Sequence, residues 1–123
     1  MARTPVSSAR DPEEPGSPTS PDAALRSFHR PTRDWFRDRF PAPTLAQELG
    51  WPPMARRESV LLLAPTGSGK TLAAFLGALD RLLFDPVPDA SARCRVVYVS
   101  PLKALAVDVE RNLRSPLAGI RQA

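Results

Sequence analysis

The sequence is poor in the residues that bind metals and form disulfides. Among its 123 residues there is one cysteine, Cys94, and one histidine, His29. A single cysteine excludes an internal disulfide and a metal site built from several cysteines. Cys94 lies next to an apolar run, which favours a small core residue over a catalytic thiol. His29, in a polar segment, is expected to face solvent.

Long apolar stretches are absent as well. The longest apolar run, residues 60–65, has the length of a strand, whereas a membrane helix needs roughly 20 consecutive apolar residues. Arg3 and Arg10 are followed by no apolar stretch, so the beginning of the chain lacks the pattern of a secretory signal peptide. We therefore expect a cytoplasmic protein that does not enter a membrane.

Lysine is scarce although the chain is basic. The formal net charge is +4, and Lys70 and Lys103 are the only lysines among 17 cationic side chains. A positive charge favours an anionic partner such as nucleic acid, but many small basic domains bind no polyanion. The charge alone therefore leaves the partner open.

The composition divides the chain into two regions. Residues 1–22 are rich in proline, serine, threonine and glutamate, with little to bury. This pattern predicts a disordered leader. Residues 23–123 have an ordinary apolar content and are expected to form one folded unit.

Short helices are expected at the start of the folded unit. Asp22 can cap a helix over residues 22–28, and Pro31 suits the first turn of a second helix that ends before Pro41. Aromatic side chains at helical spacing are candidates for the core or for a docking face. They are Trp35, Phe36 and Phe40.

A capping signal marks the next helix. Thr44 is a candidate N-cap, and Gln47 follows three residues later, which is the spacing of a capping box. We expect this helix to continue to about Leu49 and a separate short piece to start at Pro52 and Pro53.

Two apolar runs, residues 60–64 and 95–100, fit parallel strands that are buried on both faces. An amphipathic helix is expected after each, one from Lys70 and one from Pro101 to Pro116. The alternation predicts the start of a doubly wound parallel α/β sheet. The expected apolar faces are Leu72, Phe75, Leu76, Leu79, Leu82 and Leu83 on the first helix, and Leu102, Leu105, Ala106, Val109 and Leu113 on the second.

The turn between the first strand and its helix matches the phosphate-binding P-loop. The pattern requires a small residue, four spacers, and then Gly-Lys-Ser/Thr, and about one per cent of chains of this size match it by chance. An apolar strand before it and an amphipathic helix after it are the required context. The alternative is a glycine-rich turn that only joins strand to helix. The loop consists of Ala64, Pro65, Thr66, Gly67, Ser68, Gly69, Lys70 and Thr71.

Each residue type that this pattern requires has a physical role. Gly67 and Gly69 allow backbone conformations in which successive N–H groups point inward. The helix that starts near Lys70 adds its free N–H groups and the positive end of its dipole. Lys70 is expected to reach the β- and γ-phosphates, and the Thr71 hydroxyl to ligate Mg²⁺. The sequence therefore predicts a nucleotide site.

Residues 40–47 resemble the adenine-sensing Q motif of superfamily 2 helicases, residues 64–71 resemble their motif I, and residues 98–105 resemble their motif Ia. More closely, the chain from about residue 32 to 123 is similar to the N-terminal part of Lhr-type (large helicase-related) ATP-dependent helicases, which are DEAD/DEAH-box-like. The resemblance implies the N-terminal portion of a RecA-like P-loop NTPase domain, in which helices flank a parallel sheet.

The resemblance also implies roles for particular residues. Gln47 would bond to the adenine edge and favour ATP, while Lys70 and Thr71 would hold the triphosphate and Mg²⁺. Lys103, with Ser100 and Pro101 at the start of the helix, would touch the backbone of a bound single strand.

The spacing of Lys103 and Arg114 agrees with nucleic-acid binding. They lie 11 residues apart, which places both on one face of a helix, where two cations can follow phosphates. The alternative is an ordinary solvated face in which Glu110 pairs with Arg114.

The Asp-Glu pair of the family's second ATPase motif does not occur in the chain. Hydrolysis needs these carboxylates to hold Mg²⁺ and to position water. We therefore interpret the chain as a truncated helicase that does not hydrolyse ATP alone. The intact protein would translocate on one strand and unwind DNA or a DNA/RNA duplex, for example in DNA repair. The alternatives are a non-catalytic nucleotide-binding module and a small P-loop kinase.

Overall fold

The computed structural model describes residues 21–123. The leader expected over residues 1–22 lies almost entirely outside this range and stays a prediction. The elements are the helices α1 (Pro21–Leu25), α2 (Arg30–Arg39), α3 (Leu45–Ala55), α4 (Lys70–Phe84) and α5 (Lys103–Gln122), with a 3-10 turn at Ala90–Ala92 before α5. No helix within residues 21–123 combines the length and the apolar character needed to cross a bilayer.

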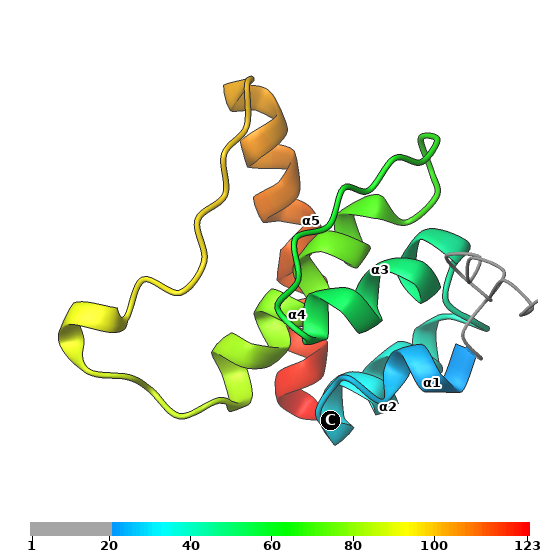
Figure 1. The fold of residues 1–123 in the computed structure, drawn as a ribbon, viewed down its shortest axis with the longest axis horizontal. Helices are drawn as coiled ribbons and strands as arrows, with labels where there is room; N and C mark the ends of the chain where they lie inside the picture. Colours follow the sequence, from blue (N-terminus) through cyan, green and yellow to red (C-terminus); the bar gives the residue numbers. More distant parts are fainter. Residues whose placement is uncertain (1–20) are drawn as a thin grey trace, which may run out of the picture.

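The five helices pack around one aromatic core. Helix α3 packs against α1 and α4, and α5 packs against α2 and α4 (Figure 1). The rings of Phe28 and Phe36 meet the Trp51 ring edge to face at 4.9 Å and 5.4 Å. Of the three expected aromatic residues, Trp35 and Phe36 belong to the core, whereas Phe40 is 40% exposed and lies outside it. We call the following residues the helical core: Ala24, Leu25, Phe28, Trp35, Phe36, Trp51, Leu76 and Ile120.

The expected α/β sheet is absent from residues 21–123, which contain no β-strand. Residues 60–64 and 95–100, here called the two extended segments, follow separate paths that do not lie side by side (Figure 1). A strand forms only when its backbone N–H and C=O groups bond to a neighbouring strand, and neither segment has such a neighbour among the described residues. As a result, Leu63 and Val99 are each 84% exposed.

The start of the chain follows its capping and proline signals in part. Helix α1 ends at Leu25, so it is shorter than the helix expected over residues 22–28. Asp22 lies in its first turn rather than before it. Pro31 occupies the first turn of α2, which ends at Arg39, as expected.

Helix α3 begins with the expected capping box. The Thr44 side chain accepts a bond from the Gln47 backbone N–H, and the Gln47 side chain accepts one from the Thr44 N–H. The expected break at Pro52 and Pro53 is wrong, because α3 runs unbroken to Ala55. Trp51 anchors the helix at this point, since its indole N–H donates to the Ala73 carbonyl at 3.1 Å. This anchoring and the burial of the ring offset the missing proline N–H groups.

The expected end of α5 at Pro116 is also wrong. The helix passes through this proline and continues to Gln122. Pro116 and Ile120 are both buried, and Pro116 lies with Trp35 of α2 around one cavity. Burial of these apolar groups against α2 offsets the cost of a proline inside a helix, which is about 3 kcal/mol on an exposed surface.

Candidate functional site

The turn before α4 has the backbone shape that the P-loop pattern predicts. Gly67 and Gly69 both have left-handed conformations, with φ of 81° and 75°. Gly69 is the N-cap of α4, and no side chain caps this helix end. The N–H groups in the first turn of α4 therefore have no acceptor within the helix. Together with the positive end of the helix dipole, they form a local environment that favours an anion.

Gly69 is required here for a second reason. A Cβ atom at this position would lie 2.5 Å from Nε2 of Gln47. The close approach is possible only because glycine has no side chain, so α3 and the loop meet directly at this point. At Gly67, by contrast, a Cβ atom would meet no atom of residues 21–123 within 4 Å, and only its φ favours glycine.

The loop is closed by bonds of its own polar groups. The Lys70 ammonium group donates to the carbonyl oxygen of Ala64, at the other end of the loop. The Ser68 hydroxyl donates to the Pro65 carbonyl at 2.6 Å. Lys70 therefore lies inside the loop, where a phosphate oxygen could replace the Ala64 carbonyl as its acceptor.

The residues at the start of α3 bond directly to the loop. Nε2 of Gln47 donates to the Gly69 carbonyl at 3.2 Å, and its Oε1 accepts from the Thr44 N–H at 3.0 Å. The Thr44 hydroxyl donates to the Ser68 carbonyl at 2.7 Å. Sequence reasoning identified Thr44 only as a helix cap, and nothing in the sequence pattern indicated its bond to the loop. The adenine contact expected of Gln47 stays a prediction. In the structure this buried amide bonds to partners within the chain.

A cavity of about 640 Å³ joins the two motifs. Its wall brings Gln47, Lys70 and Thr71 together, as the sequence predicts, and also includes Phe40. Sequence reasoning placed Phe40 in the Q motif but gave it no contact with the site. Three of the expected loop residues, Ala64, Pro65 and Ser68, lie outside this wall and line a neighbouring depression. The full lining is Phe40, Ala42, Thr44, Gln47, Thr66, Gly67, Gly69, Lys70, Thr71 and Leu72.

The groups around this cavity fit a nucleotide better than a metal ion alone. The free N–H groups of α4 and the ammonium group of Lys70 are donors for phosphate oxygens. Over residues 21–123, no three carboxylate, histidine or cysteine side chains gather where they could hold a metal. Thr71, which is exposed, carries the hydroxyl that the P-loop pattern assigns to Mg²⁺.

The residues expected to contact nucleic acid do not line this cavity; Ser100, Pro101 and Lys103 lie at the start of α5, and Arg114 lies in its middle. Ser100 donates its hydroxyl to the Leu102 carbonyl at 3.2 Å, and Pro101 and Lys103 are exposed. Arg114 donates to Glu110 at 2.7 Å, which is the pairing that the alternative interpretation expected. This bond and the charge of Arg114 lower the pKa of Glu110.

One of the two rare side chains differs from its expected setting. Cys94 is exposed rather than in the core, because the neighbouring extended segment has no partner to cover it. His29 is exposed as expected, with 47% of its side chain accessible, and its ring also pairs with the buried carboxylate of Asp80 at 2.9 Å. No sequence pattern singled out Asp80.

Comparison with known proteins identifies similar sequences and one similar structure. The sequence pattern of the family described as DEAD/DEAH box helicase matches residues 44–122. The chain is 58% identical over 96 residues to a Lhr helicase/probable uracil glycosylase of Mycolicibacterium smegmatis, covering 78% of this chain and 6% of that protein. It is 51% identical over 98 residues to the Lhr helicase/uracil glycosylase of Escherichia coli, covering 76% of this chain and 6% of that protein.

A solved structure supports the same relationship. The Mycobacterium smegmatis helicase Lhr, bound to ssDNA and AMP-PNP, superimposes with a TM-score of 0.69 at 57% identity. The match covers 79% of this chain and 12% of that one. The present chain thus spans only a small part of the length of the relatives that it matches.

Proposed function

This chain belongs to the DEAD/DEAH box helicase family, and from that premise we propose that it forms part of the ATP-binding domain of an Lhr-type helicase. The intact helicase would couple ATP hydrolysis to movement along one nucleic-acid strand and to duplex unwinding. The main support is the single cavity in which the capping-box residues of α3 and the glycine-rich loop meet. A relative described as ATP-dependent helicase Lhr-Core protein 2, from Thermococcus barophilus, is 44% identical over 93 residues, covering 75% of this chain and 11% of that protein.

The phosphate donors lie at one place in the cavity, the N-terminus of α4, and this favours one orientation of a bound nucleotide. The triphosphate would lie at the α4 N-terminus, where Lys70 would exchange the Ala64 carbonyl for phosphate oxygens. The base would lie toward Phe40 and Gln47, which line the same cavity. Mg²⁺, when bound, would offset phosphate charge, and Thr71 is the residue that would hold it. The bond between Gln47 and the Gly69 carbonyl links the base side of the site to the phosphate side.

We propose that the start of α5 contacts a single strand of nucleic acid. Ser100, Pro101 and Lys103 would touch the strand first, and Arg114 would follow about 16 Å further along the helix. In the absence of a strand Arg114 is paired with Glu110, so a bound strand would compete with Glu110 for this cation. The solved structure of the similar Mycobacterium smegmatis protein contains ssDNA, which supports this type of partner.

We propose that the two extended segments are strands of a RecA-like sheet. Their exposed apolar side chains are of the kind that a parallel sheet buries on both faces. The chain spans about 6% of the two Lhr relatives described above, and further residues of such a domain would supply the neighbouring strands. In a longer polypeptide the segments would then be paired and covered.

We propose that this chain binds Mg-ATP but does not hydrolyse it. No Asp-Glu pair occurs in its sequence, and no carboxylate of residues 21–123 lines the wall of the cavity. Activation of water by a P-loop ATPase requires such groups.

A binding titration tests the proposal. Fluorescent Mg-ATP should bind the folded chain, and Lys70→Ala should weaken binding at least about tenfold, as expected for a lost charge-assisted hydrogen bond. Lys103→Ala is the matched control, because it removes the other lysine at a distance from the cavity. No affinity in a folded sample, or equal affinity of wild type and Lys70→Ala, would contradict nucleotide binding. ATP turnover that Lys70→Ala abolishes would contradict the proposed inactivity.

A further inference from the structure

Asp80 is a buried carboxylate that has no part in the sites described above. It lies on α4 and is 2% exposed. Its two oxygens accept the His29 backbone N–H at 3.1 Å and 3.3 Å, and Oδ2 also lies 2.9 Å from Nδ1 of the His29 ring. Among the described residues, His29 is the only group within ion-pair distance of this carboxylate. Burial of a carboxylate is costly unless it is hydrogen-bonded, so this placement needs a reason.

The carboxylate completes the N-terminus of α2. His29 is the N-cap of this helix, and its own side chain makes no capping bond. In a capping box the third helical residue accepts the N-cap N–H, but α2 has Thr32 there, and the Thr32 hydroxyl has no partner among the described residues. Asp80 supplies the missing acceptor from another helix. It also places negative charge at the positive end of the α2 dipole.

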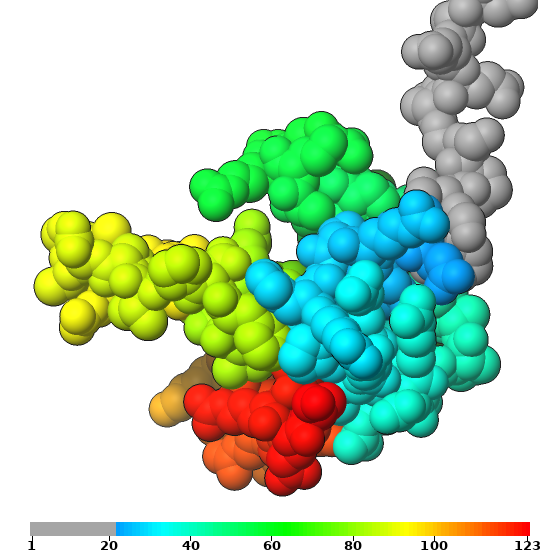
Figure 2. Space-filling view, turned by 90° about the horizontal axis from the view of Figure 1, so that it is seen from below, coloured from blue at the N-terminus to red at the C-terminus, as the bar shows by residue number. Residues whose placement is uncertain are grey.

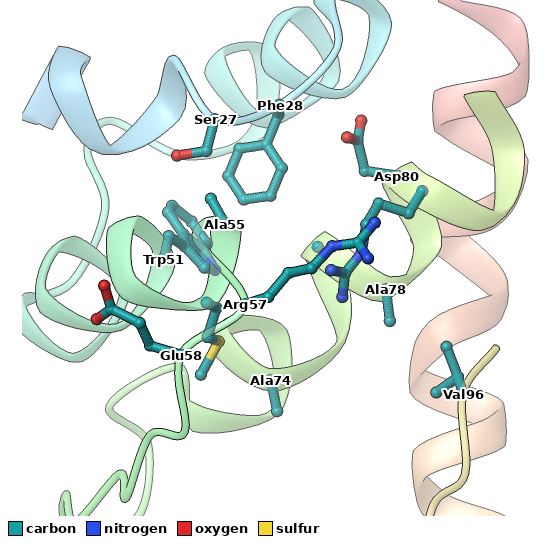
Figure 3. A pocket seen from close by; sticks show the side chains of 13 residues that line it. Ser27, Phe28, Trp51, Ala55, Arg57, Glu58, Ala74, Ala78, Asp80 and Val96 are labelled. Atoms are coloured by element: carbon teal, nitrogen blue, oxygen red, sulfur yellow. The ribbon is translucent and has the colours of Figure 1, made fainter. Parts of the chain in front are cut away.

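Figure 3 shows the direction in which the Asp80 side chain points. The Asp80 carboxylate points from α4 toward the N-terminal helices, on the side where Phe28 lies, and away from Ala78 and Val96. The carboxylate therefore connects α4 to the N-terminal part of the chain, while Asp80 also lines the pocket shown in the figure.

The other end of α2 leads to the nucleotide cavity. Phe40 directly follows α2, and it lines two cavities together with Thr71 and Leu72 at the start of α4. Helix α2 therefore runs antiparallel to α4, from Asp80 back to the P-loop. Ten residues of helix span about 15 Å, which matches the distance along α4 from Thr71 to Asp80. The chain then continues from Phe40 directly to the capping box of α3.

We propose that Asp80 is a positioning residue for the nucleotide site. By holding the N-terminus of α2, it fixes the segment of residues 40–47 against the loop to which Thr44 and Gln47 bond. This inference rests on the proposed nucleotide binding, because it assigns Asp80 a role in the same site.

Hydrogen–deuterium exchange tests the positioning without any nucleotide. Asp80→Ala should speed exchange about tenfold at the amides of residues 29–47, while the amides of residues 73–79 in α4 keep their protection. Asp80→Asn should restore most of the protection, because an amide oxygen can still accept the His29 N–H. Asp38→Ala is the matched control, since it removes an exposed carboxylate from α2 itself.

Mg-ATP titration of the same variants tests the consequence for the site. Asp80→Ala should weaken binding about tenfold, Asp80→Asn should lie within about threefold of wild type, and Asp38→Ala should match wild type. His29→Ala should have less than about a twofold effect, because it keeps the backbone N–H that Asp80 accepts.

Each result either supports or overturns the inference. Wild-type protection of residues 29–47 in Asp80→Ala, or faster exchange in every helix, would overturn it. If Asp80→Ala does not fold, Asp80→Asn is the deciding variant, because its amide oxygen can still accept a bond from the His29 N–H. Protection of residues 29–47 in Asp80→Asn as low as in an unfolded chain would then overturn the inference. If Lys70→Ala loses affinity for Mg-ATP while Asp80→Ala keeps the wild-type affinity, the role of Asp80 is rejected and the proposed nucleotide binding stands. Absence of Mg-ATP binding in the wild type would reject the proposed function, and exchange would still decide the positioning.

Discussion

The helical core and the two extended segments are built from similarly apolar residues, yet they end in opposite environments. Trp51 is 2% exposed, whereas Leu63 and Val99 are each 84% exposed. A helix satisfies its backbone hydrogen bonds within its own segment, so it needs a partner only for one face. A strand needs a neighbour both for its backbone and for its faces. Burial of apolar residues in this chain therefore depends on available packing partners and not on hydrophobicity alone. Figure 2 shows the segments near residues 60 and 90, in green and yellow, standing out from the packed helices.

Helix α5 has exposed apolar residues at its start and buried apolar residues near its end. Leu102 and Leu105, which belong to its expected apolar face, are exposed at its start. Pro116 and Ile120 are buried near its end, where α5 packs against α2. The apolar face is continuous in the sequence, but only its second half finds a partner among the described residues.

The largest effect is expected from Trp51→Ala, which removes the centre of the helical core. The substitution deletes two edge-to-face ring contacts and the bond to the Ala73 carbonyl. It should lower the free energy of unfolding by about 3–5 kcal/mol. Urea unfolding followed by circular dichroism measures the loss. Leu63→Ala is the matched control and should change stability by less than about 0.5 kcal/mol. Similar losses in both variants would show that the extended segment is as well packed as the core.

The same comparison explains what could be predicted from the sequence. The capping box of Thr44 and Gln47 and the left-handed glycines of the loop depend on neighbours within a few residues, and these predictions were confirmed. The helix break at Pro52 was wrong because the anchor of Trp51 is Ala73, which is distant in sequence.

The link between Asp80 and His29 shows the same limit. These residues are 51 positions apart, and no local pattern marks such a pairing. The sheet was predicted from the apolar runs and the order of elements, but its formation depends on neighbouring strands that residues 21–123 do not provide.

An intermediate effect is expected when the extended segments gain partners. In this chain, Leu63→Asp and Val97→Asp should each change the free energy of unfolding by less than about 0.5 kcal/mol, because both side chains are exposed. The chain should then be joined to the remaining helicase domain of the similar Mycolicibacterium smegmatis protein. There the same substitutions should cost more than about 2 kcal/mol, because each would bury a charge in a sheet. Urea unfolding of both forms measures the difference. A small cost in the joined protein would contradict the proposal that these segments are strands.

The smallest effect is expected at Glu110, on the exposed side of α5. Glu110→Gln removes the charged partner of Arg114 and should leave this cation free for phosphate, which would raise the affinity for a single-stranded oligonucleotide by about twofold. The pKa of Glu110 is lowered by its hydrogen bond from Arg114, so the pair is intact above the ordinary glutamate range and is lost as pH falls through the lowered pKa. The difference between wild type and variant should therefore be present at neutral pH and vanish on acidification.

Fluorescence anisotropy at fixed salt measures this difference in affinity, with Asp108→Asn as the control that removes a charge from α5 without releasing Arg114. Equal gains in the two variants would mean that net charge, and not the freed arginine, sets the affinity at this surface.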